Sequence, residues 1–153
     1  MRPTGSHAPS RRTLLAAGLA CSLSAISRPS RAAGELEAAV AAFAGGTPVR
    51  NGRVTLAVAA LVENGNTVPI AVSVDSPMTA ESHVTTIAVF NERNPQREVA
   101  VFHLGPRAGR ASVSTRIRLA TSQKLVAVAR LNDGTLWSDT VEVIVTLAGC
   151  VEG

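Results

Sequence analysis

The chain has 153 residues with 15 basic and 11 acidic side chains, a formal net charge of +4. Five arginines lie before residue 32 and the first acidic residue is Glu35, so beyond residue 32 the chain has ten basic and eleven acidic groups. That balance leaves no persistent basic surface, so we expect no nucleic-acid partner and no electrostatic binding to anionic membranes.

Residues 1–32 have the pattern of an export signal. Arg11 and Arg12 precede an apolar run that extends to about Ile26, and small residues up to Ala32 suit a signal peptidase that cuts after this alanine. The run is shorter than the about 20 apolar residues of a membrane-spanning helix and is interrupted by serines. We predict a cleaved twin-arginine signal peptide, a periplasmic location and no stable membrane insertion. Lipid attachment at Cys21 is an alternative.

A short amphipathic helix is the first predicted element of the exported chain. Leu36, Val40 and Phe43 follow the i, i+4, i+7 spacing of one helix face, and Gly45-Gly46 come directly after them. The pattern therefore predicts a helix over residues 35–43 that ends at the glycine pair.

From residue 53 onward the apolar period changes to two. The expected strands are rich in Val, Ile and Thr, and turn residues separate them; they cover residues 54–58, 68–74, 84–90, 99–104, 112–119, 125–131 and 141–146. Seven short strands at this spacing are typical of an immunoglobulin-like antiparallel β-sandwich. We therefore predict an all-β domain at residues 33–146, with a short N-terminal helix.

Several side chains are functional candidates. Arg116 and Arg118 share the polar face of a strand, as a solvated face or a partner surface, and Trp137 is either a packing anchor or a recognition residue. His83 and His103 do not have metal-ligand spacing with each other or with a cysteine. The sequence contains no phosphate loop and no nucleophile elbow. We expect no metal, no cofactor and no independent catalysis.

Cys150 is the only cysteine that remains after the predicted cleavage. In an oxidising periplasm it is either an intermolecular link or a reactive thiol. We expect residues 147–153 to form a flexible C-terminal arm, with Ala148, Gly149 and Gly153 supplying the flexibility. Four residues beyond Thr146, the thiol would move through roughly 13 Å. The residues alone leave three interpretations open: a covalent carrier, a disulfide cross-link and an incidental cysteine.

The chain resembles the SoxY family, the sulfur-carrier subunits of the periplasmic Sox thiosulfate-oxidation system. Four long stretches carry this resemblance in the same order as in the family: "ENGNTVPIAVSVDSPMT" (residues 63–79), "IAVFNERNPQ" (87–96), "VSTRIRLATSQKLVAVARLNDGTLW" (113–137) and "EVIVTLAGC" (142–150). With the twin-arginine leader, the resemblance covers essentially the whole sequence.

The resemblance implies a non-enzymatic carrier that pairs with a SoxZ-like subunit, as a heterodimer or a higher assembly. Thiosulfate would be coupled to Cys150 by a SoxAX-type cytochrome, sulfate released by SoxB, and the remaining sulfur oxidised by SoxCD. The carrier itself would hold no cofactor. The alternative function is a periplasmic structural or interaction domain that uses Cys150 only for disulfide-linked dimerisation.

The sequence departs from the family after the cysteine. The family arm usually ends Gly-Gly-Cys-Gly-Gly, whereas Cys150 is followed by Val151, Glu152 and Gly153. The bulk of Val151 and the negative charge of Glu152 would change how the arm enters the channels of the partner enzymes. A paralogue with a related carrier role therefore stays an alternative.

Overall fold

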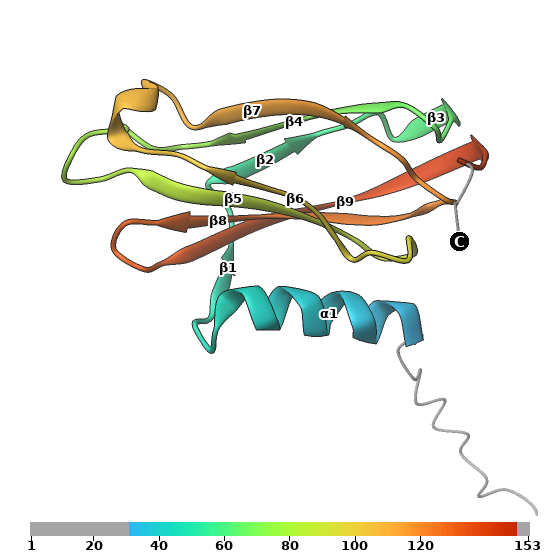
Figure 1. Ribbon diagram of the computed structural model, residues 1–153, viewed down its shortest axis with the longest axis horizontal. Coiled ribbons are helices and arrows are strands. Elements are labelled where there is room, and N and C mark those ends of the chain that lie inside the picture. Colours follow the sequence, from blue (N-terminus) through green and yellow to red (C-terminus); the bar gives the residue numbers. More distant parts are fainter. Residues whose placement is uncertain (1–30, 150–153) are drawn as a thin grey trace, which may run out of the picture.

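The computed structural model describes residues 31–149, which form one helix and two β-sheets packed face to face (Figure 1). The elements in chain order are α1 (Arg31–Ala44), β1 (Val49–Asn51), β2 (Val54–Ala57), β3 (Leu61–Asn64), β4 (Val68–Val74), β5 (Val84–Asn91), β6 (Glu98–His103), a 3₁₀ turn η1 (Pro106–Ala108), β7 (Ser112–Ile117), β8 (Gln123–Leu131) and β9 (Leu136–Leu147). The expected all-β, immunoglobulin-like sandwich with a short N-terminal helix is confirmed.

The larger sheet has the strand order β1-β9-β8-β5-β6, and β3 pairs in parallel with the C-terminal end of β9. The smaller sheet has the order β2-β4-β7 and is antiparallel. All seven expected strands are present, although β9 begins at Leu136, earlier than predicted, and β7 ends at Ile117 instead of Leu119. The two strands that were not predicted, β1 and β3, have only three and four residues. Segments of this length are too short to show the alternation of apolar and polar residues that indicates a strand.

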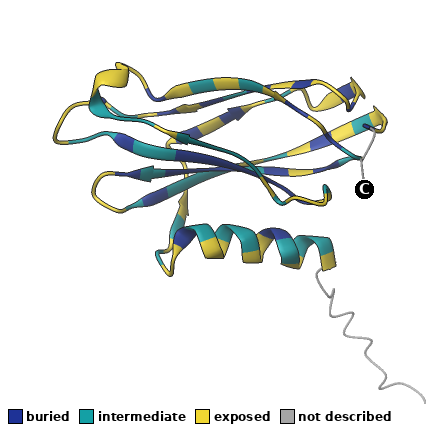
Figure 2. Cartoon of the chain, in the orientation of Figure 1, coloured by how far each residue is buried: buried dark blue, intermediate teal, exposed yellow. Residues whose placement is uncertain are grey.

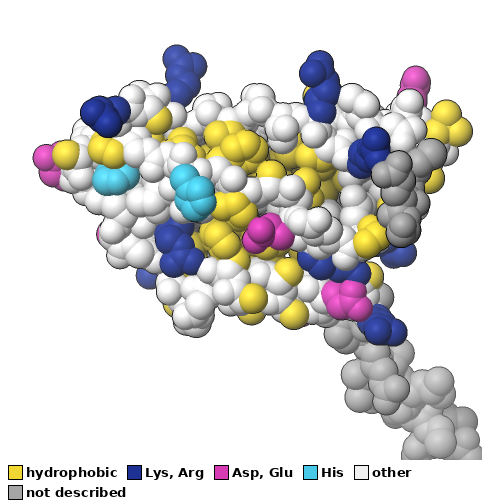
Figure 3. Space-filling model, viewed as in Figure 1, with side chains coloured by type: hydrophobic (Ala, Val, Ile, Leu, Met, Phe, Trp, Pro, Cys, Tyr) yellow, Lys and Arg dark blue, Asp and Glu magenta, His cyan; other side chains and the backbone are white. Residues whose placement is uncertain are grey.

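The core lies between the two sheets. Strand β4 shows the alternation that builds it, because Val68, Ile70, Val72 and Val74 are buried while Pro69 and Ser73 are exposed. Figure 2 shows buried positions concentrated where the sheets face each other. In the face shown in Figure 3, hydrophobic side chains also reach the surface between the sheets.

Helix α1 covers the outer face of the larger sheet, so β5 and β8 are buried on both sides. The rings of Phe43 and Phe90 meet edge to face with centroids 5.7 Å apart. The guanidinium of Arg130 lies 5.1 Å from the centroid of the Phe43 ring. It also donates a hydrogen bond to the backbone carbonyl oxygen of Phe43. The helix ends as predicted, because Gly45 and Gly46 adopt the positive φ angles of 61° and 87° that stop it.

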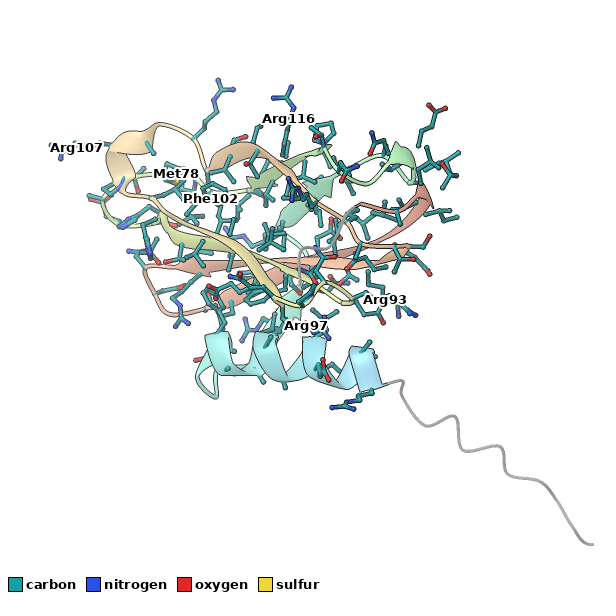
Figure 4. The ribbon with its side chains drawn as sticks, turned by 45° about the vertical axis from the view of Figure 1, so that its right-hand side comes forward. Met78, Arg93, Arg97, Phe102, Arg107 and Arg116 are labelled. Atoms are coloured by element: carbon teal, nitrogen blue, oxygen red, sulfur yellow. The ribbon has the colours of Figure 1, made fainter. Side chains whose placement is uncertain are left out.

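The first turns of α1 are held by a long-range ion pair. Arg97, in the turn between β5 and β6, donates to the carboxylate of Glu35, and Figure 4 shows this arginine between the sheet and the helix. Arg31, one turn before Glu35, is a second and more exposed partner. The hydrogen bond and the charge of Arg97 lower the pKa of Glu35 below its ordinary value of 4.5.

Acidification should therefore loosen the start of α1. A carboxylate with a lowered pKa stabilises the folded state above its unfolded pKa, and this contribution is lost as the pH falls through the folded value. We expect amide exchange in α1, corrected for its intrinsic pH dependence, to accelerate as the pH falls below 4.5. Glu35→Gln has no carboxylate to protonate and should show a weaker pH dependence. Equal acceleration in both proteins would contradict this role of Glu35.

Candidate functional site

The predicted attachment residue, Cys150, lies outside the described residues, as do Gly153 and the leader at residues 1–30. The structure does place the two residues that precede the cysteine. Ala148 is exposed, whereas Gly149 is buried. The structure therefore shows the chain up to the residue before the cysteine.

Gly149 belongs to a chain of backbone hydrogen bonds that we call the glycine clasp, formed by Gly65, Leu119, Leu147 and Gly149. The amide of Gly65 donates to the carbonyl of Leu147 at 2.9 Å. The amide of Leu119 donates to the carbonyl of Gly65 at 2.8 Å, and the amide of Gly149 donates to the carbonyl of Leu119 at 3.0 Å. The clasp joins the end of β9 to two turns that are distant in sequence.

Gly65 and Gly149 must both be glycine, because a Cβ atom at either position would clash with backbone atoms of the clasp. A Cβ atom on Gly65 would lie 2.3 Å from the carbonyl oxygen of Leu119 and 2.7 Å from the amide nitrogen of Gly149. A Cβ atom on Gly149 would lie 2.8 Å from the Leu119 oxygen and 2.9 Å from the Gly65 oxygen. These atoms belong to hydrogen-bonded backbone, so they cannot move aside without breaking the clasp.

The turn at residues 64–66 presents Gly65 to the clasp. It follows β3, and the side chain of Asn64 accepts a hydrogen bond from the amide of Asn66 at 2.9 Å, as in an Asx turn. On the other side of the clasp, Asn94 braces the segment after β7. Its side chain donates to the carbonyl of Arg118 at 2.7 Å and accepts from the amide of Ala120 at 3.0 Å. Both sides of Leu119 are thus fixed by side-chain hydrogen bonds.

The clasp was not anticipated from the sequence, which indicated only a turn at residues 64–66. The sequence predicts a free arm that starts at residue 147, with Ala148, Gly149 and Gly153 as its flexible residues. In the structure Leu147 and Gly149 both make backbone hydrogen bonds, and Gly149 serves close packing. The flexibility of the arm at residues 147–153 stays a prediction.

The other sequence candidates lie away from the clasp, or beside it without joining it. Trp137 is partly buried against the core, and the guanidinium groups of Arg50 and Arg53 lie 5.7 and 5.5 Å from its ring, so it serves packing. Arg116 projects from the smaller sheet and lines an open groove there (Figure 4). Arg118 is exposed and precedes Leu119.

The described part of the chain contains no group of three or more His, Cys, Asp or Glu side chains placed to hold a metal ion. Between residues 31 and 149 there is also no helix with the length and hydropathy needed to cross a bilayer.

The solved structures that resemble this chain include a sulfur carrier protein and superoxide reductases. The sulfur carrier protein SoxY from Chlorobium limicola f thiosulfatophilum is 32% identical, with a TM-score of 0.64, over 75% of this chain and 99% of that one. A superoxide reductase (neelaredoxin) from Ignicoccus hospitalis is 20% identical, with a TM-score of 0.55, over 61% of this chain and 80% of that one. A putative superoxide reductase from Thermotoga maritima is 24% identical, with a TM-score of 0.52, over 67% and 89%. At these identities the reductases share the fold alone.

A comparison with curated proteins finds no match. The family described as sulfur oxidation protein SoxY matches residues 40–150, which extend from the second half of α1 through the clasp to the cysteine. Together with the Chlorobium structure, which is aligned over nearly its whole length, this match assigns the family. The chain belongs to the SoxY family of sulfur oxidation proteins.

Proposed function

We propose that the chain is a non-enzymatic periplasmic carrier whose Cys150 holds thiosulfate-derived sulfur while other proteins process it. The observation that carries the proposal is the family match, which ends at Cys150 itself. The related Chlorobium protein is described as a sulfur carrier. Export by the twin-arginine route and pairing with a SoxZ-like subunit belong to the same proposal and rest on the leader sequence and on the family.

The chemistry needs a thiolate and two external reactions. Loading joins the Cys150 thiolate to the outer sulfur of thiosulfate, which forms Cys–S–S–SO₃⁻ and releases two electrons to a c-type cytochrome. Hydrolysis by a second enzyme then consumes one water and gives Cys–S–S⁻, sulfate and two protons. The carrier supplies only the sulfur nucleophile, whose ordinary pKa near 8.5 leaves it mostly protonated until a partner supplies positive charge.

The glycine clasp fixes the position on the sandwich from which the carrier would present its thiol. With Gly149 bonded to Leu119, covalent geometry keeps the Cys150 sulfur within roughly 7 Å of the Gly149 Cα. This radius is shorter than the roughly 13 Å expected from a chain that is free after residue 146. Opening of the clasp would restore the longer reach. The clasp thus controls how far the thiol extends from the sandwich.

Replacement of the thiol tests the attachment site. We expect Cys150→Ser to abolish loading by thiosulfate and the cytochrome, because the hydroxyl of serine does not form the S–S bond. The measurement is the intact mass of the chain after incubation, with the adduct located by fragmentation. Folding and pairing with the SoxZ-like subunit should be unchanged.

The same experiment separates the carrier from the cross-link. A reducible sulfur adduct on Cys150 of the wild-type chain supports the carrier. A mass that shows only disulfide-linked dimers, or an adduct that persists in Cys150→Ser, would contradict it.

Substitution in the clasp tests its packing. Gly65→Ala places a methyl group 2.3 Å from the Leu119 carbonyl oxygen, so the backbone must shift and clasp hydrogen bonds must break. We expect the free energy of unfolding in urea to fall by about 1–3 kcal/mol, as for other overpacked sites. The matched control is Gly105→Ala, because a Cβ atom there meets no heavy atom within 4 Å. Equal effects of the two substitutions would show that the clasp is not tightly packed in solution.

A further inference from the structure

Arg118 lies directly beside the glycine clasp. Its carbonyl accepts the 2.7 Å hydrogen bond from the side chain of Asn94, and the next carbonyl, that of Leu119, accepts the amide of Gly149 at 3.0 Å. Arg118 is exposed. Among residues 31–149 no carboxylate lies within ion-pairing distance of its guanidinium. An unpaired cation therefore stands one residue from the carbonyl that anchors the end of the described chain.

The charges near Arg118 are mainly positive. The sequence from residue 99 to residue 132 has six basic and no acidic residues. Arg93, in the turn that braces the clasp, is half exposed, although an ion pair at 3.9 Å with the buried Glu92 partly neutralises its charge. The exposed carboxylate of Glu63 in β3 opposes this positive field. Attraction of an anion to this part of the surface thus depends chiefly on Arg118.

We propose that Arg118 binds the sulfonate group of the cargo on Cys150 and so favours anionic sulfur compounds at this thiol. The inference rests on the proposed carrier function, in which the loaded arm ends in Cys–S–S–SO₃⁻. A planar guanidinium can donate two parallel hydrogen bonds to such an oxyanion, as it does to carboxylate and phosphate groups. The chain would then recognise its cargo as well as hold it.

Covalent geometry permits this contact. The path through the Leu119 carbonyl and its 3.0 Å hydrogen bond keeps the Cα atoms of Arg118 and Gly149 within roughly 11 Å of each other. The Cys150 sulfur lies within roughly 7 Å of the Gly149 Cα, and the sulfonate oxygens extend roughly 4 Å beyond that sulfur. An extended arginine side chain spans roughly 7 Å. These reaches together exceed the separation, so the clasp can stay closed while the anion is bound.

Tetrathionate allows the recognition step to be measured without a cytochrome. The Cys150 thiolate attacks an inner sulfur of this dianion, which forms Cys–S–S–SO₃⁻ and releases thiosulfate as the leaving group. Dithiodipyridine is the matched reagent, because it is a neutral disulfide that reacts with the same thiolate and has no sulfonate. A change in the thiolate itself alters both rates, so the ratio of the two rate constants reports recognition of the anion.

Removal of the Arg118 charge tests the inference. We expect Arg118→Gln to lower the ratio of the tetrathionate to the dithiodipyridine rate constant about threefold at low ionic strength, as for an exposed ion pair. Arg118→Lys keeps the charge without the forked donors and should give an intermediate ratio. The matched control is Arg107→Gln, which removes the same charge from the exposed turn η1. Figure 4 shows Arg107 and Arg93 at opposite ends of the molecule.

A second measurement locates the bound anion. In NMR spectra of the chain loaded with tetrathionate, the Nε–H resonance of Arg118 should shift and that of Arg107 should not. An unchanged ratio in Arg118→Gln, an equal decrease in Arg107→Gln or an unshifted Arg118 resonance would overturn the anion site and leave the carrier function intact. Failure of thiosulfate and the c-type cytochrome to form an adduct on the wild-type chain would overturn the carrier function, and with it the assignment of the anion as cargo.

Discussion

The contact between Gly65 and Gly149 around the Leu119 carbonyl is the constraint that links the fold to its function. Three backbone segments meet there with no room for a Cβ atom on either glycine. Each hydrogen bond of the clasp joins residues far apart in sequence: Gly65 to Leu147, Leu119 to Gly65, and Gly149 to Leu119. Leu119 lies two residues after the end of β7 in the smaller sheet, and Leu147 ends β9 of the larger sheet, so the clasp ties both layers of the sandwich to the segment that precedes Cys150.

The rest of the sandwich supports this point. Helix α1 covers the outer face of β5 and of β8, the long neighbour of β9, so these two strands are packed on both sides and form a rigid base. Beyond the last pair of β8 with β9, the end of β9 pairs with β3 instead, and Val62 and Val145 of this pairing pack on the core. A rigid sandwich that anchors the chain up to Gly149 is a suitable scaffold for a sulfur carrier, because functional groups are positioned best by rigid elements.

The strands and the helix stop were predictable because local pattern determines them. Strand β4 alternates buried and exposed residues, and Gly45-Gly46 end α1 through positive φ angles. Strand β3 was not predictable, because it has four residues and exists through its pairing with β9, some eighty residues away. The clasp was not predictable either, because its contacts join residues that are distant in sequence. A glycine between Asn64 and Asn66 indicates a turn, and only the folded chain shows what packs against it. Cys150 is proposed as the attachment residue from the sequence, lies outside the described residues and stays a prediction.

The central claim is that the chain is anchored up to the residue before the thiol. Amide hydrogen exchange at Gly149, followed by NMR on the full-length chain, tests it most directly. The account predicts that exchange is slowed at least about a hundredfold relative to an unstructured peptide of the same sequence, because the Gly149 amide is buried and bonded to Leu119. Exchange at the unstructured rate would mean that the clasp is open in solution, and this would contradict the account.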